Sequence, residues 1–225
     1  MLTGFTAALV LITLSELGDK SFLITALLAM RYPRWLVFWG TIAALGLMTI
    51  ISAMMGQVSQ LFPKIYVHWA EVLLLAGFGI LSIWQSYQIK NHGKTCETEL
   101  AEAKAEIEET ELSPSAQSWL GKGLARFLEP ILGRNFRNIL ATFGKSFTLV
   151  FIAEWGDRTQ FTTIALAAGN HPVAVTVGAI LGHSICSAIA VIAGCLLAGY
   201  LSERVVMFFG GILFLIFAGV VYFEP

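Results

Sequence analysis

The chain has 225 residues, of which 56% are hydrophobic and 13% charged, and its mean hydropathy is +0.74. This composition excludes an ordinary soluble domain of that length and indicates a polytopic membrane protein, so the lipid bilayer is an expected partner. The formal net charge of −1 says little about partners, because the position of each charge matters more in a membrane protein. We expect no nucleic-acid partner. The three cysteines lack C-x-x-C spacing, which argues against a disulfide framework or a soft-metal site.

Six apolar runs are long enough to cross a bilayer as helices, because a hydrocarbon core of about 30 Å requires about 20 helical residues. They cover residues 3–30, 35–57, 66–88, 139–169, 172–199 and 202–223. Backbone polar groups in lipid must be satisfied internally, so each run is expected to be a helix. The predicted fold class is therefore an all-α membrane protein with six transmembrane helices.

The first and fourth spans carry the same charged motif. Residues 16–21 are Glu-Leu-Gly-Asp-Lys-Ser, and residues 154–159 are Glu-Trp-Gly-Asp-Arg-Thr. Charged side chains at membrane depth are costly, so they indicate a functional site. In a continuous helix, a Glu and an Asp three positions apart share one face, about one turn from each other. The Gly between them is expected to let another helix approach closely.

The two motifs belong to a longer internal repeat. Three spans per half is an odd number, so the second half must enter the membrane from the opposite side, as in the inverted repeats of secondary transporters. We expect a first repeat over 1–89, a loop over 90–138 and a second repeat over 139–225. Adding 138 to the residue number relates Glu16 to Glu154, Asp19 to Asp157, Thr25 to Thr163, Gly40 to Gly178 and Thr49 to Ser187.

The central loop has two parts. Residues 97–111 are rich in glutamate and are expected to form a solvated helical linker, with a cation-attracting or regulatory segment as the alternative. Residues 119–131 alternate apolar side chains with Lys122 and Arg126, a pattern typical of an amphipathic helix in the headgroup region.

Basic residues near the helix ends predict the orientation, because they concentrate on the cytoplasmic side. The opposite side holds only Lys64. We therefore expect a cytosolic central loop and both termini outside the cytoplasm, in a bacterial inner membrane or in an organelle membrane such as the thylakoid. The basic residues on the cytosolic side are Arg31, Arg34, Lys90, Lys94, Lys104, Lys122, Arg126, Arg134, Arg137, Lys145 and Arg204.

The motif residues predict a cation site. If the two motif helices meet at mid-membrane, their four carboxylates and two basic side chains face one cavity with a formal charge of −2. One divalent cation or about two protons would neutralise it, which is the requirement for exchange. Oxygen ligands favour manganese, calcium or magnesium over zinc or copper. The expected metal ligands are Glu16, Asp19, Glu154 and Asp157, with Lys20 and Arg158 balancing charge.

Other polar side chains on the spans are weaker candidates. Accessory oxygen ligands are expected from Ser21, Thr25, Thr159, Gln160 and Thr163. Residues that could line the cavity are Thr49, His183 and Ser187. For the hydroxyls of the second and fifth spans, hydrogen bonding back to the helix or to a neighbouring helix is the simpler interpretation; these are Thr49, Ser52, Ser184 and Ser187. For His183, a satisfied core histidine competes with a proton acceptor in the cavity. Glu71 is interpreted as an ordinary interfacial carboxylate.

The doubled E-x-G-D-[KR]-[ST] motif, as ELGDKS from Glu16 and as EWGDRT from Glu154, resembles the Gdt-type cation/proton antiporter family over essentially the whole chain. That family includes Golgi and chloroplast calcium/manganese transporters and bacterial manganese exporters. The resemblance implies manganese as cargo, calcium as the alternative, and protons as counter-ion, with no tightly bound cofactor. It places the family's motif acids on Glu16, Asp19, Glu154 and Asp157.

Two other functions compete with cation exchange. An exporter of small organic solutes, such as amino acids, could use the basic residues to bind a carboxylate. An intramembrane aspartyl protease could use Asp19 and Asp157, but such enzymes carry Gly where this chain has Glu16 and Glu154. We expect a transporter rather than an enzyme, and leave the formation of an oligomer open.

Overall fold

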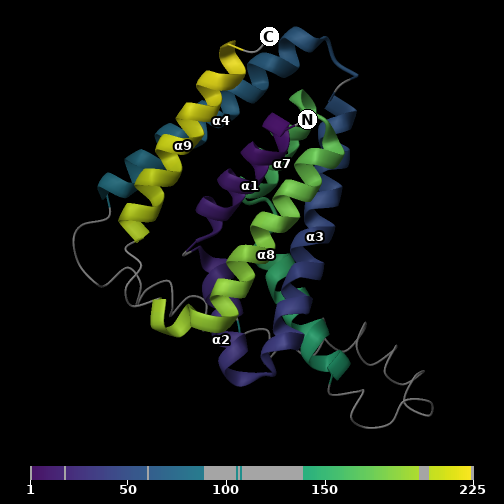
Figure 1. Ribbon diagram of the computed structural model, residues 1–225, viewed down its shortest axis with the longest axis vertical. Helices are drawn as coiled ribbons and strands as arrows, with labels where there is room; N and C mark the ends of the chain where they lie inside the picture. Colours follow the sequence, from purple (N-terminus) through teal and green to yellow (C-terminus); the bar gives the residue numbers. More distant parts are fainter. Residues whose placement is uncertain are drawn as a thin grey trace.

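The structure is a computed structural model that describes residues 2–17, 19–59, 61–88, 105, 107, 139–197 and 203–223, without the side chains of 193–197, 203 and 206. Within these ranges every regular element is a helix, which confirms the all-α fold (Figure 1). The elements are α1 (Leu2–Glu16), α2 (Lys20–Arg31), α3 (Arg34–Ser59), α4 (Lys64–Gln88), an unlabelled helix Ile139–Ala153, α7 (Arg158–Gly169), α8 (Pro172–Leu197) and α9 (Glu203–Phe223).

Each motif interrupts its helix, so the prediction of two continuous helices through the motifs is wrong. α1 ends at Glu16 and α2 begins at Lys20, while the helix Ile139–Ala153 ends before the second motif and α7 begins at Arg158. The first and fourth spans are therefore each two short helices in series. The Glu and Asp of one motif lie on opposite sides of a break instead of on one helical face.

Aspartate and glycine explain the interruption. Asp19 and Asp157 are the N-cap residues of α2 and α7, with nearly identical extended backbone angles (φ −73° and ψ 169°; φ −76° and ψ 167°). Asp is among the preferred N-cap residues because its carboxylate accepts from the free N–H groups of the first turn. Gly156 has φ +84°, a conformation that glycine adopts readily, and open space where a Cβ would lie. Gly156 therefore serves the turn, and not the close helix approach that the sequence suggested.

The helix contacts show the repeat directly. A Cβ at Gly40 of α3 would collide with the Phe143 carbonyl of helix Ile139–Ala153. A Cβ at the equivalent Gly178 of α8 would collide with the Phe5 carbonyl of α1, and Phe5 is equivalent to Phe143. In the same way, α4 and α9 approach each other closely at two glycines. A Cβ at Gly79 of α4 would meet the Gly211 carbonyl of α9, and a Cβ at Gly211 would meet the Gly79 carbonyl. Each repeat thus packs on the other by the same small-residue contacts.

The two repeats run in opposite directions. Figure 1 shows α1 leading down to α2 from the end that carries the N-terminus, whereas helix Ile139–Ala153 lies low and α7 lies high. α3 and α8 likewise lie side by side across the repeats. Both chain ends lie near the same, upper end of the bundle. This is the arrangement expected of inverted repeats.

By length and composition, three described helices could each cross a membrane: α3, α4 and the Pro172–Ile192 part of α8. Leu2–Glu16, Ile139–Ala153 and Met207–Phe223 are shorter apolar helices. Large apolar side chains such as Trp35, Leu73 and Ile192 are exposed on the outside of the bundle, as expected for a protein surrounded by lipid.

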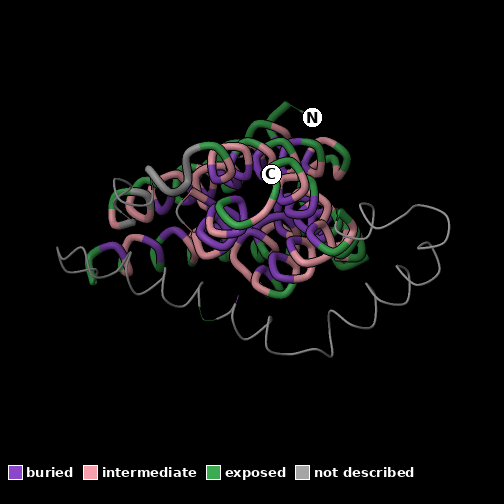
Figure 2. The backbone as a smooth tube through the Cα atoms, turned by 90° about the horizontal axis from the view of Figure 1, so that it is seen from below, coloured by how far each residue is buried: buried purple, intermediate pink, exposed green. Residues whose placement is uncertain are grey.

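Buried residues lie in the interior of the bundle (Figure 2). They form two clusters. One contains Phe22 of α2 and Val150 of helix Ile139–Ala153. The other contains Leu11 of α1 and Leu166 of α7. In each motif-bearing span, the half-helix before the motif packs in one cluster and the half-helix after the motif packs in the other. The packed clusters hold the four half-helices in place, and the charged turns lie at the boundary between them.

Glu71, interpreted from the sequence as an ordinary interfacial carboxylate, is buried between helices. Its side chain is only 3% exposed, because α4 packs against the end of α7, where a Cβ at Gly169 would overlap the Glu71 carboxylate. The predicted linker over 97–111 and the predicted amphipathic helix over 119–131 lie outside the described residues, except Ala105 and Ile107. Ile107 is buried in the cluster that contains Phe22.

The glycine contacts predict a difference between two substitutions of the same kind. Gly178→Ala places a methyl group against the Phe5 carbonyl and should cost about 1–3 kcal/mol of stability by overpacking. Gly144→Ala, in helix Ile139–Ala153, meets nothing within 4 Å and should be neutral or slightly stabilising, since Ala favours helix by up to about 1 kcal/mol. Melting temperatures of the purified variants in one detergent measure both effects. Equal melting temperatures would contradict the tight α1–α8 contact.

Candidate metal centre

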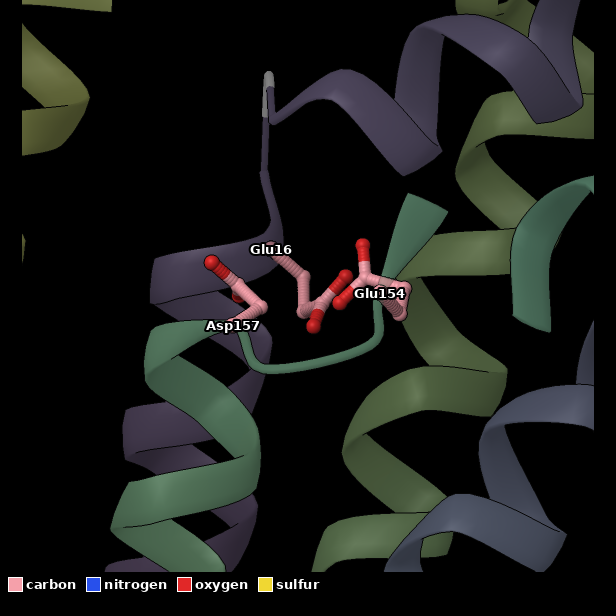
Figure 3. Close-up of side chains that lie close together, drawn as sticks. All are labelled: Glu16, Glu154 and Asp157. Carbon is pink, nitrogen blue, oxygen red and sulfur yellow. The ribbon is translucent and has the colours of Figure 1, made fainter. Parts of the chain in front are cut away.

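Three carboxyl groups from the two repeats converge at the helix breaks (Figure 3). Glu16, Glu154 and Asp157 each offer one oxygen, and these oxygens all lie within 4.8 Å of one another. Glu16 and Glu154 are 2% and 4% exposed, and Asp157 is half-buried. Figure 3 shows the Glu16 and Glu154 carboxyl groups facing each other, with Asp157 beside them on the turn into α7. Oxygens this close can surround a single cation.

The breaks place these groups by the same local geometry in both repeats. The Asp19 N–H donates to the Glu16 carbonyl (3.3 Å), and the Asp157 N–H donates to the Glu154 carbonyl (3.2 Å). Each glutamate therefore lies at a helix C-terminus, and each aspartate precedes a helix N-terminus. Interrupted helices at membrane depth expose backbone carbonyls and dipole ends toward an ion, as in transporters with discontinuous helices.

The carboxylates of Glu16 and Glu154 each have one buried oxygen without a hydrogen bond among the described residues. Ser21 Oγ donates to Glu16 Oε2 at 3.0 Å. Glu16 Oε1 and Glu154 Oε2 are buried and have no hydrogen-bond partner among the described residues. A buried polar atom without a partner is costly, and a buried unpaired charge costs more. The arrangement therefore favours an additional positive ligand, either a cation or protons on the carboxylates.

Asp157 combines two roles in one side chain. Its Oδ2 accepts from the Thr159 N–H (3.3 Å) and from Thr159 Oγ1 (3.4 Å), so it caps α7 while its carboxyl group belongs to the cluster. Gln160 Oε1 accepts from the Gly156 N–H at 2.8 Å and secures the turn. Thr159 and Gln160 thus support the turn that positions Asp157.

Asp19, which is equivalent to Asp157, lies outside the group of three. Its carboxylate accepts from the Lys20 N–H at 2.9 Å, and its Oδ2 lies 3.8 Å from Arg158 Nη2 of the other repeat. These two side chains are about one-fifth exposed, at 21% for Asp19 and 22% for Arg158. Lys20 is half-buried as the first residue of α2. The sequence predicts four equivalent acids, whereas packing brings three together and leaves the fourth beside Arg158.

The hydroxyl groups mostly bond within the helices. Thr163 Oγ1 donates to the Thr159 carbonyl (2.8 Å), and Thr49 Oγ1 donates to the Leu45 carbonyl (2.7 Å). Thr25 Oγ1 lies 3.3 Å from Thr41 Oγ1 and joins α2 to α3. The Thr49 contact agrees with the interpretation of that hydroxyl as bonded back to its own helix, and Thr25 and Thr163, expected as accessory ligands, also bond to protein oxygens.

A small cavity of about 10 Å³ adjoins the cluster on the Glu154 side, between α3, α7 and α8. A volume of this order holds about one water-sized particle. Thr25, Ser21 and Ser187 do not line it, although Ser187 is buried. Its lining consists of Leu45, Met48, Thr49, Ser52, Glu154, Thr159, Gln160, Thr163 and His183.

The model of the divalent cation/proton antiporter GDT1 family matches residues 4–90 and 142–225 of the chain. The chain belongs to this family. Both matched segments contain one charged motif, and the unmatched residues between them fall within the predicted central loop or next to it. This GDT1-family chain is therefore a membrane transporter of divalent cations and protons, which favours cation exchange over the organic-solute and protease hypotheses.

Individual GDT1 relatives align over nearly the whole chain. A GDT1-like protein of Synechocystis sp. is 45% identical over 97% of this chain and 96% of its own length. GDT1-like protein 5 of Arabidopsis thaliana is 40% identical over 96% of this chain and 94% of its own length. Protein PAM71, chloroplastic, of A. thaliana is 39% identical over 99% of this chain, which spans 57% of that relative. No solved structure matches this chain.

Ser52 also lines the cavity of this GDT1-family site, and its Oγ donates to the Met48 carbonyl at 2.8 Å, as expected for a hydroxyl that bonds back to its own helix. One feature was missed by sequence reasoning. The Asp19–Arg158 contact between repeats has no sequence signal, because it depends on how the two half-helix ends pack.

Proposed function

We propose that the chain exports Mn²⁺ from the cytoplasm in exchange for protons, with Ca²⁺ as the alternative cargo. Glu16, Glu154 and Asp157 bind the cation, and Asp19 contributes through its contact with Arg158. The observation that carries the proposal is the convergence of three carboxyl groups from two inverted repeats at the helix breaks. The ligands are oxygens, which suit Mn²⁺, Ca²⁺ and Mg²⁺.

The charge of the site supports exchange. The four motif acids and the basic Lys20 and Arg158 have a formal sum of −2, and two acid oxygens are buried without a hydrogen bond among the described residues. One divalent cation or about two protons would neutralise this charge. The same site then holds either the cation or the protons, and one ligand displaces the other.

In the proposed cycle, a cation from the cytosolic side displaces protons from the carboxyl groups. The two repeats, 1–89 and 139–225, then rock against each other and open the site to the other side, where protons displace the cation. The central loop, 90–138, lies in the cytosol, and both termini lie outside it, in a bacterial inner membrane or in an organelle or thylakoid membrane. This orientation is supported by the distribution of Lys and Arg.

Proteoliposomes with an internal manganese-sensitive dye test the function. We expect Mn²⁺ entry to accelerate when the interior is more acidic than the exterior, because protons leaving the vesicle drive the cation inward. Parallel vesicles with a calcium dye compare the two cargoes. Mn²⁺ and Ca²⁺ fluxes that do not respond to the pH gradient would contradict proton-coupled exchange.

A further inference from the structure

His183 is a buried side chain at the edge of the carboxylate group. It lies on α8, is 4% exposed and lines the cavity beside Glu154. Its Nδ1 lies 3.5 Å from Glu16 Oε1. Neither atom has a hydrogen-bond partner among the described residues. Two potential ligand atoms therefore face each other in the interior without a polar group that satisfies either of them.

The separation of these two atoms suits a shared cation. Protein ligands lie about 2.0–2.6 Å from a bound divalent metal, so two ligands at right angles around one ion lie about 2.8–3.7 Å apart. The pair of His183 Nδ1 and Glu16 Oε1 falls at the upper end of this range. Glu16 Oε2 accepts a hydrogen bond from Ser21, so Oε1 is the carboxylate oxygen that faces His183.

The fold does not require a histidine at the position of His183, because the equivalent position in the first repeat carries a different residue. His183 is equivalent to Leu45, and the cavity-lining Gln160 is equivalent to Phe22. The cavity is therefore lined by a nitrogen ligand from α8 and, at the equivalent position on α3, by the apolar side chain of Leu45.

We propose that His183 ligates the transported cation through Nδ1, together with Glu16, and that it selects Mn²⁺ over Ca²⁺ and Mg²⁺. This inference rests on the proposed function of the same site. The carboxylates alone would accept all three ions, because each of these hard cations binds oxygen. An imidazole nitrogen adds affinity for a first-row transition metal, whereas Ca²⁺ and Mg²⁺ gain little from exchanging oxygen for nitrogen.

Binding of Mn²⁺ to the purified full-length chain tests the proposal by spectroscopy. In wild-type protein, the electron spin echo of bound Mn²⁺ should show modulation from a directly coordinated ¹⁴N nucleus, and His183→Gln should remove it. Competition between metals should show Mn²⁺ affinity falling by about tenfold or more in His183→Gln, with a much smaller change for Ca²⁺. Ser184→Ala is the matched control on α8, since Ser184 bonds to the Ile180 carbonyl and does not line the cavity.

The outcomes separate this inference from the proposed function. Bound Mn²⁺ without ¹⁴N modulation in wild-type protein, or an unchanged preference for Mn²⁺ over Ca²⁺ in His183→Gln, would overturn the role of His183 and leave cation exchange standing. A wild-type chain that neither binds nor transports Mn²⁺ or Ca²⁺ would overturn both. The wild-type spectrum decides the question of ligation even where His183→Gln fails to fold.

Discussion

Replacement of Glu154 by glutamine should abolish cation-for-proton exchange while leaving the protein folded in the membrane. The variant loses a charged ligand and a proton-binding group but keeps nearly the same volume in a site that is 4% exposed. Truncating one partner of a buried charge interaction costs about 3 kcal/mol or more, which corresponds to more than about a hundredfold in affinity. Glu16→Gln should have an effect of the same size, since Glu16 is the equivalent residue in the other repeat.

Glu71→Gln is the matched control for the glutamate variants. Glu71 is as deeply buried as Glu154, at 3% exposure, but it lies against the end of α7 and not in the carboxylate group. Exchange in vesicles should therefore persist in Glu71→Gln. Exchange at the wild-type rate in Glu154→Gln, with protein levels and melting temperature unchanged, would remove Glu154 from the site.

Asp157→Asn should also eliminate exchange, but without loss of helix α7. Asn caps helices about as well as Asp, so the hydrogen bonds from Thr159 can be kept while the ligand charge is lost. Asp157→Ala removes the cap as well and should lower the stability further, by about 1 kcal/mol. Transport assays combined with melting temperatures separate the two roles.

The equivalent substitution Asp19→Asn tests whether the two repeats contribute equally. Asp19 lies outside the group of three and faces Arg158 at 3.8 Å, with both side chains partly exposed. Asp19 adds to the negative charge of the site without belonging to the group of three, so we expect Asp19→Asn to slow exchange but to leave more of it than Asp157→Asn does. An equal and complete loss of exchange in Asp19→Asn and Asp157→Asn would show a symmetric site and contradict this assignment.

The sequence was sufficient for the features that depend on hydropathy and periodicity. The apolar runs, the offset of 138 between the motifs and the odd number of spans per half predicted an all-α inverted repeat. The glycine contacts between repeats agree with that prediction: Gly40 and Gly178 meet equivalent residues of the opposite repeat. Small residues at equivalent positions are readable from sequence because every helix contact of this kind needs them.

The break within each motif could not be recognised from hydropathy, because the apolar run continues through it. The Gly-Asp pair is itself a signal for the end of one helix and the start of the next, and the structure follows this signal instead of the helical spacing of the Glu and the Asp. The difference between Asp19 and Asp157 and the approach of His183 to Glu16 arise from tertiary packing of equivalent or distant residues. Sequence alone treats such positions as interchangeable, and only the arrangement of the half-helix ends distinguishes them.

Proton release on metal binding tests the central claim most directly, because a ligand that replaces protons must set them free. Purified protein in a weakly buffered solution with a pH dye would be titrated with Mn²⁺, and the protons released would be divided by the Mn²⁺ bound. We expect about two protons per Mn²⁺ for the wild-type chain, as required by a site of formal charge −2, and little binding or release for Glu154→Gln. Stoichiometric Mn²⁺ binding to the wild-type chain without release of protons would contradict the account.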